Sequence, residues 1–315
     1  MNAPANEAQI QDIVYALAAS PQSGVCFAAR MSGLYCSEDG GATWSFAYNS
    51  LKLTGPLPTL AVALSPDFEH DRSVFAGTPG GVLHSVDAGQ TWYITMLPSP
   101  PPSVSTLVVS PNFVRDGVLL AGTTDAGVFS SADRGSHWVA WNFGLLDLGV
   151  MVMAISPDFA NDETIYVGTE SGIFRSTNGG RAWREVDLPI GYEAVLSLAL
   201  SPNYAKDGIV FAGTESQGLL YSADRAKTWT NLGESVINDA VNAIVLSPDY
   251  PAKPDILVML GTALLISRDN GQSWSAWPAD LSLEQGLSAL AAPYGLETGV
   301  PLLVGLVEDG VRRIG

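Results

Sequence analysis

The sequence predicts an all-β protein, a single seven-bladed β-propeller whose blades are four-stranded antiparallel sheets. The chain of 315 residues repeats a pattern of four short apolar strands about every 45 residues, which is typical of propeller blades. A turn motif of eight residues recurs in six of these units, and its tryptophans follow one another at intervals of 45 to 48 residues. The two ends of the chain together supply a seventh unit.

Within each unit, three strands precede the turn motif and one follows it. The first strand is an apolar run that ends in Ser-Pro, as in residues 198–202, and the second is a β-branched and aromatic run that ends in Gly-Thr, as in residues 210–214. A short turn leads to the third strand, as in residues 172–176. The motif then turns the chain into a fourth strand that begins at its tryptophan. Short strands separated by Gly, Pro, Asp and Ser are the expected signature of antiparallel blades.

The seventh unit is divided between the two ends of the chain. Residues 286–315 repeat the first three strands and contain no turn motif, while residues 10–21 align without gaps with residues 237–248 at the start of the sixth unit. We therefore expect residues 1–9 to form an N-terminal strand that closes the last blade and removes a free sheet edge. A six-bladed ring with an additional unit is the alternative. The predicted repeats of this single domain, residues 1–315, are 10–54, 59–102, 103–148, 150–191, 193–236, 240–282, and 286–315 plus 1–9.

The turn motif reads Ser-x-Asp-x-Gly-x-Thr-Trp. We expect its Asp to accept hydrogen bonds from backbone N–H groups one or two residues on, its Gly to supply a positive φ, and its indole to fill the wedge between blades. Asn178 keeps the acceptor oxygen without the charge, which indicates a structural turn. Ala226 replaces the Gly, so that turn is expected to differ in shape. The acceptor and indole positions are Asp39 and Trp44, Asp87 and Trp92, Asp133 and Trp138, Asn178 and Trp183, Asp224 and Trp229, and Asp269 and Trp274.

This motif resembles the BNR or Asp-box repeat, and the resemblance covers essentially the whole chain. It implies a propeller fold but says little about function, because proteins with this turn include sialidases, other glycosidases, sortilin-type receptors and a photosystem II stability and assembly factor. In sialidase-like propellers the active site lies on the face away from the Asp boxes. The resemblance therefore implies that the face carrying the Gly-Thr turns is the functional one.

A second repeated segment, Ser-Pro-Asp-Phe, follows the first strand of most units. Its two Asp or Asn residues, for example Asp67 and Asp71, are four residues apart. A calcium site needs several converging oxygens in one loop, so we interpret these residues as turn caps around a buried aromatic side chain. Neither a metal site nor a cofactor is expected, and the three histidines fall in unrelated segments.

Charge and composition exclude several classes of function. The 32 acidic residues exceed the 15 basic ones and give a formal charge of −17, which argues against nucleic acid as a partner. No apolar run is long enough to span a membrane, and the N-terminus lacks the features of a signal peptide. We therefore expect a cytoplasmic protein, unless a leader was removed. Cys26 and Cys36 are expected on neighbouring strands of one hairpin, as two free thiols rather than a disulfide.

The Gly-Thr face is where the units differ from one another in charge. Arg30 stands where other units have Thr78, Thr123, Thr169, Thr214 and Thr262, and it is expected to face carboxylates near the central channel. Two interpretations remain open, a solvated acidic rim and a binding site for a ligand or partner. The candidate binding residues are Arg30, Asp125, Glu170, Tyr192, Glu215 and Glu308.

These observations favour a non-catalytic scaffold that binds another protein through the face opposite the Asp boxes. The alternative is a glycoside hydrolase, or another enzyme of small molecules, that uses two of the rim carboxylates, since such enzymes need a pair of acids on either side of the sugar bond. For a glycoside hydrolase, the expected ligand is a carbohydrate. Sialidase activity is not expected, because only Arg30 stands where one of the three required arginines is needed. No catalytic residue is predicted. Leu145, Leu146, Leu148, Ile190 and Tyr192, in the connectors between blades, are candidates for an exposed apolar docking patch.

Overall fold

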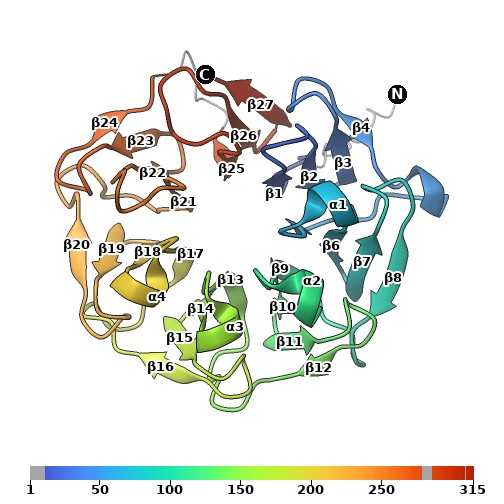
Figure 1. Ribbon diagram of the computed structural model, residues 1–315, viewed down its shortest axis with the longest axis horizontal. Helices are drawn as coiled ribbons and strands as arrows, with labels where there is room; N and C mark the ends of the chain where they lie inside the picture. The colour runs from blue at the N-terminus through green and yellow to red at the C-terminus, as the bar shows by residue number, and fades with distance from the viewer. Residues whose placement is uncertain (1–10, 279–285, 309) are drawn as a thin grey trace, which may run out of the picture.

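The computed structural model describes residues 11–278, 286–308 and 310–315. Their strands form seven small antiparallel sheets arranged as a ring around a central opening (Figure 1). In every sheet the strands follow chain order, from the innermost to the outermost. The predicted seven-bladed propeller is confirmed. The proposed closing strand, residues 1–9, lies outside the described residues, within which the seventh sheet has three strands.

The first four blades contain sixteen strands in chain order. Blade one consists of β1 (Val14–Ala19), β2 (Cys26–Arg30), β3 (Gly33–Ser37) and β4 (Ser45–Phe46). Blade two consists of β5 (Ala61–Leu64), β6 (Val74–Thr78), β7 (Gly81–Ser85) and β8 (Tyr93–Met96). Blade three consists of β9 (Val104–Val109), β10 (Leu119–Thr123), β11 (Val128–Ser131) and β12 (Val139–Ala140). Blade four consists of β13 (Val150–Ile155), β14 (Ile165–Thr169), β15 (Ile173–Ser176) and β16 (Arg184–Val186).

The remaining three blades follow the same plan. Blade five consists of β17 (Val195–Leu200), β18 (Val210–Thr214), β19 (Leu219–Ser222) and β20 (Thr230–Leu232). Blade six consists of β21 (Ala243–Leu246), β22 (Ile256–Met259), β23 (Leu264–Ser267) and β24 (Ser275–Ala276). Blade seven contains β25 (Leu287–Ala291), β26 (Leu302–Leu306) and β27 (Val311–Ile314).

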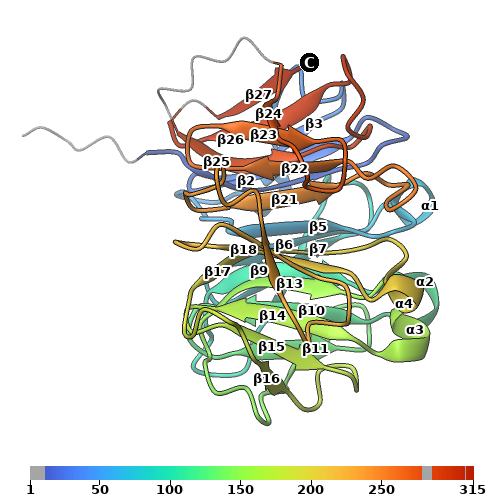
Figure 2. The ribbon, with the colours of Figure 1, turned by 90° about the vertical axis from the view of Figure 1, so that its left-hand side faces the viewer.

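Four single-turn helices occur between the first and second strands of blades two to five. They are α1 (Phe68–Asp71), α2 (Phe113–Asp116), α3 (Phe159–Asp162) and α4 (Tyr204–Asp207), and a 3-10 turn, η1 (Asn49–Leu51), follows blade one. All four helices lie along one face of the ring (Figure 2). No helix of the described residues has the length and apolar character needed to cross a membrane.

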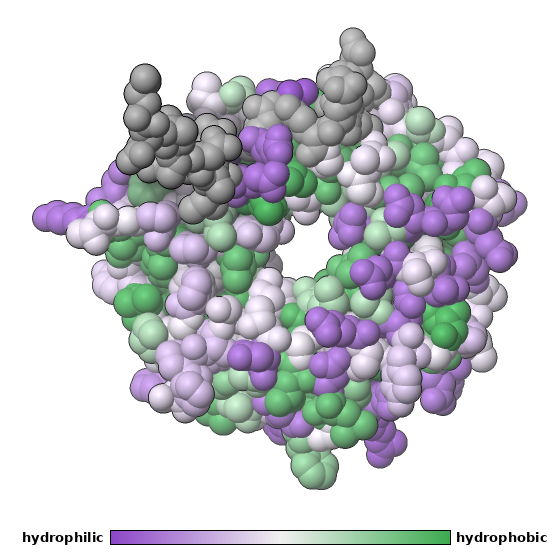
Figure 3. Space-filling view, turned by 180° about the vertical axis from the view of Figure 1, so that it is seen from behind, coloured by the Kyte–Doolittle hydropathy of each residue, from purple (hydrophilic) through white to green (hydrophobic). Residues whose placement is uncertain are grey.

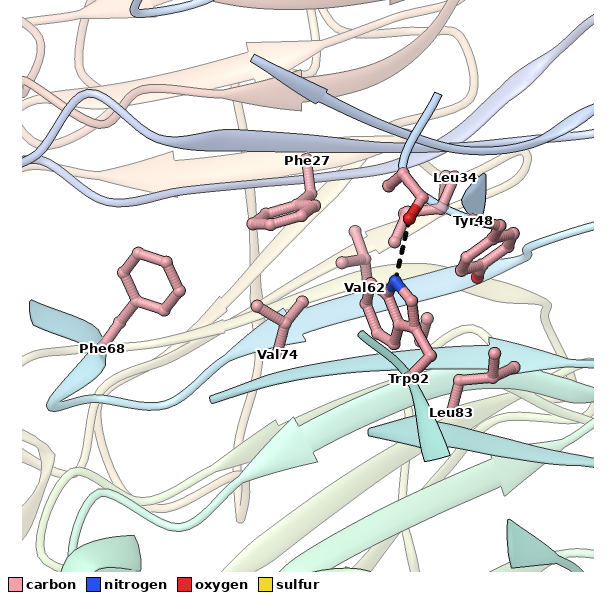
Figure 4. Close-up of a cluster of buried hydrophobic side chains, with 11 residues drawn as sticks. Phe27, Leu34, Tyr48, Val62, Phe68, Val74, Leu83 and Trp92 are labelled. Atoms are coloured by element: carbon pink, nitrogen blue, oxygen red, sulfur yellow. Dashed lines mark hydrogen bonds between the residues drawn. The ribbon is translucent and has the colours of Figure 1, made fainter. Parts of the chain in front are cut away.

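The core of the ring consists of apolar wedges between neighbouring blades. The wedge between blades one and two contains Phe27 and Leu34 from blade one and Val62 and Leu83 from blade two, and Trp92 lies among them (Figure 4). Because each blade buries both of its faces against its neighbours, its second strand is largely apolar, as the fully buried strand β6 shows. Val14 and Ala28 pack against Ala289, so blade one contacts blade seven and the ring closes through side chains.

Candidate functional site

The Asp box is a hydrogen-bonded turn between the third and fourth strands. In the first box, Asp39 Oδ1 accepts the N–H groups of Ala42 and Thr43, each at 2.9 Å, and the Ser37 hydroxyl at 2.7 Å. The Thr43 hydroxyl donates to Asp39 Oδ2 at 2.6 Å. The acceptor role is confirmed, but the donors are three and four residues on rather than one or two. The Asp therefore spans the whole turn and ties its end back to its start.

These bonds stabilise the charged carboxylates of the boxes. Hydrogen bonds from the Ser273 hydroxyl, the Ser273 N–H and the Ser267 hydroxyl lower the pKa of Asp269 to about 2. Bonds from Thr43, followed by one from Ser37, hold the pKa of Asp39 well below its ordinary value. A carboxylate held ionised in this way is unsuited to donate a proton as a general acid near neutral pH. The boxes are structural turns.

The two atypical boxes keep the same geometry. Asn178 Oδ1 accepts the Ala182 N–H at 2.9 Å and the Ser176 hydroxyl at 2.9 Å, as the Asp does in other boxes. Ala226 has a φ of 63°, in the same left-handed region as the glycine of the other boxes. Its N–H donates to the Ser222 hydroxyl at 2.9 Å, like the N–H of Gly41 to Ser37. The expectation that Ala226 changes the shape of its turn is therefore wrong, because the hydrogen bonds hold the backbone in place.

In two boxes, the indole N–H of the tryptophan donates a hydrogen bond to the connector that follows the preceding blade. Trp92 Nε1 donates at 3.0 Å to the carbonyl of Ala47, in the connector after blade one (Figure 4). Trp183 Nε1 donates at 2.7 Å to the carbonyl of Trp141, after blade three. Trp44 and Trp274 are only partly buried and bond within their own boxes. The indole fills the wedge between blades as predicted, but its contribution differs from box to box.

The Ser-Pro-Asp segments are turn caps around a buried aromatic ring, as expected. In the segment of blade two, Asp71 accepts the Ser65 hydroxyl at 2.6 Å and the Ser73 N–H at 2.9 Å, and Phe68 is buried. The first Asp or Asn of each pair does not act as a cap. Asp67, for example, precedes α1 and makes no side-chain capping bond. In the described part of the chain, no group of three His, Cys, Asp or Glu side chains is placed to hold a metal ion.

The boxes and the helix-bearing segments share one face, and the Gly-Thr turns lie on the other. The Ala88 N–H in the second box donates to the Arg72 carbonyl at the end of α1, and the Arg134 N–H donates to the Gly117 carbonyl in the same way. Figure 3 shows the opposite face, with the central opening and a mixture of hydrophilic and hydrophobic side chains around it. The two faces therefore separate structural loops from variable ones, as the sequence predicted.

The Thr of the Gly-Thr turns is a buried structural residue. The hydroxyls of Thr78, Thr123, Thr169 and Thr214 each donate to the carbonyl of the glycine that closes the turn. In blade six this position belongs to Leu260, whose N–H bonds the Ala263 carbonyl at 2.8 Å. Thr262, which the sequence pattern assigned to it, is exposed within the turn itself. The turn of blade six is shifted because apolar Leu260 takes the buried place.

Arg30 occupies the same position in blade one and is largely covered, with 13% of its side chain exposed. Its guanidinium lies 3.7 Å from Asp12 Oδ2 and over the ring of Tyr35, at 4.4 Å. Asp12 also accepts the N–H and hydroxyl of Ser32, at 2.8 and 2.9 Å. The counter-ion of Arg30 is thus Asp12, a residue that the sequence analysis did not single out, and Arg30 joins the start of the described chain to blade one.

The four candidate carboxylates are exposed and belong to turns of different blades. Asp125, Glu170 and Glu215 follow the buried Thr in blades three, four and five, and Glu308 occupies the turn of blade seven. Glu308 accepts a hydrogen bond of 2.6 Å from Gln11. Among the described residues, no hydrogen bond connects one of these four side chains to another. Their role in binding stays a prediction.

The strands nearest the central opening are uncharged. Figure 1 shows the first strand of each blade around the opening, and none of these seven strands, as described, contains Asp, Glu, Lys or Arg. They consist mainly of Ala, Val, Leu, Ile and Met. The seven inner strands, as far as they are described, therefore present no carboxylate and no basic side chain to the opening.

Two neighbouring connectors expose large apolar side chains. Phe143, Leu146 and Tyr192 are 81%, 78% and 82% exposed. Asp147 joins the first connector to the turn of blade four, because its Oδ2 accepts the Ser171 hydroxyl at 2.8 Å. Tyr192, in the second connector, borders a shallow hollow that Ser171 also lines. Phe143 lies beside the fourth Asp box, because its carbonyl accepts the Trp183 N–H at 2.8 Å. We call Leu146, Leu148 and Tyr192 the connector patch.

The connector patch agrees only in part with the candidates from the sequence. Leu146, Leu148 and Tyr192 are exposed as predicted, but Leu145 is buried against Val128 and Val150, and Ile190 is half-buried against blade five. Phe143 was not among the named apolar candidates. Its position three residues after a blade's outer strand and directly before a Gly is a signal that the sequence did offer.

The two cysteines are free thiols on neighbouring strands, β2 and β3, as predicted. Burial raises the pKa of Cys26 to about 11 and that of Cys36 to about 12. Both thiols are therefore protonated at neutral pH, which makes them poor nucleophiles.

Comparison with known proteins supports the fold and the repeat. The model of the BNR/Asp-box repeat matches residues 265–276, which contain the whole of the sixth box. This match, together with the seven-bladed ring, confirms the resemblance to Asp-box propellers. No curated protein matches the chain in sequence.

Several solved structures are similar to this chain. YCF48 bound to D1 peptide has a TM-score of 0.71 and 16% identity, covering 97% of this chain and 94% of that one. The GH74 xyloglucanase from Xanthomonas campestris has a TM-score of 0.73 and 19% identity, covering 96% of this chain and 52% of that one. The extracellular domain of a putative one-component system from B. thetaiotaomicron has a TM-score of 0.70 and 14% identity, covering 97% and 38%. This chain thus spans 52% of the length of the xyloglucanase and 38% of the length of the extracellular domain, and at these identities the likeness shows the fold alone.

Proposed function

We propose that this chain is a non-catalytic propeller that binds another protein through the face opposite the Asp boxes, with the connector patch at the centre of the contact. The observation that carries the proposal is the exposure of Leu146 and Tyr192 in two adjacent connectors. Large exposed apolar side chains gathered on one surface often mark a site that binds a partner. Aromatic side chains are also enriched at the energetic centres of protein interfaces.

The surroundings of the patch suit a protein partner. Asp147 accepts hydrogen bonds from Gly149 and Ser171, so the connector that carries Leu146 and Leu148 is fastened at its base. A preorganised loop loses little conformational entropy on binding. Polar groups such as Ser171 and Glu185 border the hollow beside Tyr192, and a polar rim around an apolar centre is typical of non-obligate interfaces.

The structural relatives include a precedent for each class of function. One is bound to a peptide and another is a xyloglucanase. The uncharged inner strands favour the binding function here, because a glycosidase needs two carboxylates on either side of the sugar bond. The four candidate carboxylates lie in exposed turns of different blades.

The experiment compares two double variants that add the same charge to opposite faces. Leu146→Asp with Tyr192→Asp changes the connector patch, whereas Val86→Asp with Val114→Asp changes two side chains of the box face that are 52% and 50% exposed. Exposed substitutions of this kind change stability by about 0.5 kcal/mol or less, so melting temperatures serve as the folding control. Proteins captured from the native host are quantified for both variants and the parent protein.

Loss of the captured partner in the patch variant alone supports the proposal. Equal capture by all three proteins, or loss only in the box-face variant, contradicts it. A glycan panel that includes xyloglucan tests the enzyme alternative with Glu170→Gln and Glu215→Gln. Hydrolysis by the parent protein that these variants abolish would replace the binding function with a hydrolase.

A further inference from the structure

Two arginines face each other across the outer hairpin of blade four. Arg175 in β15 is the direct partner of Arg184 in β16, and Ile173 is the partner of Val186. Ile173 and Val186 pack against Tyr204 and other residues of blade five. Because side chains alternate along a strand, Arg175 and Arg184 point to the same side, toward blade five.

Blade five supplies a third cation to this place. Arg175, Arg184 and Lys227 line one hollow between the two blades, with Ala226 beside them. The Arg175 guanidinium donates to the Arg225 carbonyl at 2.6 Å, which fixes its direction. Arg225 itself turns away, because its guanidinium bonds the Ala205 carbonyl and lies over the ring of Tyr204.

Two acidic residues also border the hollow, but they do not neutralise it. Glu185 is the partner of Phe174, which packs toward blade three, so its side chain leaves β16 on the other side. Asp187 follows the end of the strand and is exposed. None of the ion pairs found in the described residues includes Arg175, Arg184 or Lys227.

The opposition of two arginines destabilises the folded protein, and among the four-stranded blades it occurs only in blade four. Like charges directly opposite each other in an antiparallel pair are destabilising, and this chain has 32 acidic residues against 15 basic ones from which to supply partners. The same cross-strand position contains no Asp, Glu, Lys or Arg in the other four-stranded blades. Those pairs are Cys36 with Ser45, His84 with Tyr93, Ser130 with Val139, Tyr221 with Thr230, and Ile266 with Ser275.

We propose that Arg175, Arg184 and Lys227 form a binding site for an oxyanion, a phosphate or carboxylate group. Arginine presents a planar fork of donors that matches these groups, and lysine adds a compact charge. An anion in the hollow offsets the repulsion between the two arginines. The site lies between blades four and five, and its three cations are not part of the connector patch, so it does not depend on the proposed protein-binding function.

The oxyanion has two sources, a free ion or a group carried by a peptide segment, and the test separates them. Inorganic phosphate and a seven-residue peptide with one phosphoserine are titrated into the full chain at low ionic strength, with the unphosphorylated peptide as the reference. Binding is measured by calorimetry and by the rise in melting temperature. Saturable binding of phosphate alone identifies a free ion, and binding of the phosphopeptide identifies a peptide-borne group.

The variant Arg184→Gln with Lys227→Gln is expected to weaken binding about tenfold or more, because it removes two of the three charge-assisted donors. Arg184→Gln alone is expected to leave the melting temperature of the free protein unchanged or to raise it. The matched control is Arg115→Gln with Lys206→Gln, which removes two exposed cations from α2 and α4 and is expected to bind like the parent protein. Absence of saturable binding of both probes to the parent protein would overturn the proposal, as would equal binding by the two double variants.

Discussion

Replacing Trp92 with alanine is expected to destabilise the ring more than the same change in the first Asp box. Trp92 is 7% exposed and packs edge-on against Tyr48 at a centroid distance of 5.3 Å. Its Nε1 donates to the carbonyls of Ala47 and Gly89, each at 3.0 Å. The substitution removes the apolar contacts between two blades and leaves these carbonyls without their donor.

The magnitude follows from these contacts. Truncating a buried Trp to Ala costs about 3–5 kcal/mol, and we take about 4 kcal/mol here. At about 2 °C per kcal/mol for a chain of this size, the melting temperature falls by about 8 °C. Trp44→Ala is the matched control, because Trp44 is only partly buried and bonds only the Gly41 carbonyl of its own box. Its cost is expected to be about half as large.

The assay is urea and thermal unfolding followed by far-UV circular dichroism, which does not depend on the fluorescence of the tryptophan removed. The interpretation of the box indole as an inter-blade fastener would be refuted if Trp44→Ala destabilised the protein as much as Trp92→Ala. A loss of less than about 1 kcal/mol for Trp92→Ala would also refute it, since that is the scale of an ordinary substitution.

Two further predictions concern the box carboxylates. Asp87→Asn is expected to cost about 1 kcal/mol, the scale of one hydrogen bond, because Asn178 already accepts the N–H group four residues on in the fourth box; urea unfolding measures this, and a loss as large as that of Trp92→Ala would contradict the acceptor role. Acidification is expected to destabilise the protein between about pH 4 and pH 2, because the pKa of Asp269 is about 2 in the folded state and near 3.9 in the unfolded chain. In that window the unfolded state binds protons that the folded state does not, so stability falls as the pH falls. Asp269→Asn should make the urea midpoint less dependent on pH, and an unchanged dependence would exclude this box as a contributor.

The sequence was sufficient to predict the ring because one local pattern recurs. Each box combines an acceptor, a left-handed turn and an aromatic residue within eight positions, and these features determine the hairpin without reference to distant residues. The exception of Ala226 shows the limit of this reasoning. The conformational preference of alanine predicts a different turn. Hydrogen bonds to the side chains of Ser222 and Asp224 nevertheless hold the backbone around Ala226 in place.

The surface was harder to predict because it depends on contacts between units. Asp12 pairs with Arg30 although they belong to different segments, and Leu260 rather than Thr262 fills the buried turn position of blade six. Leu145 and Leu146 are adjacent in sequence, yet one is buried and the other exposed. The opposition of Arg175 and Arg184 was accessible in principle, because the hairpin around each box pairs residues nine positions apart.

Mapping the surface that a bound partner covers tests the central claim most directly. Amide hydrogen exchange is measured for the protein alone and in complex with the partner recovered from its host. Binding through the face opposite the Asp boxes predicts slower exchange in residues 143–149, 170–172 and 188–193, with no change in the helix-bearing loops at residues 65–72 and 110–117. Protection confined to those helix-bearing loops would contradict the account and assign binding to the Asp-box face.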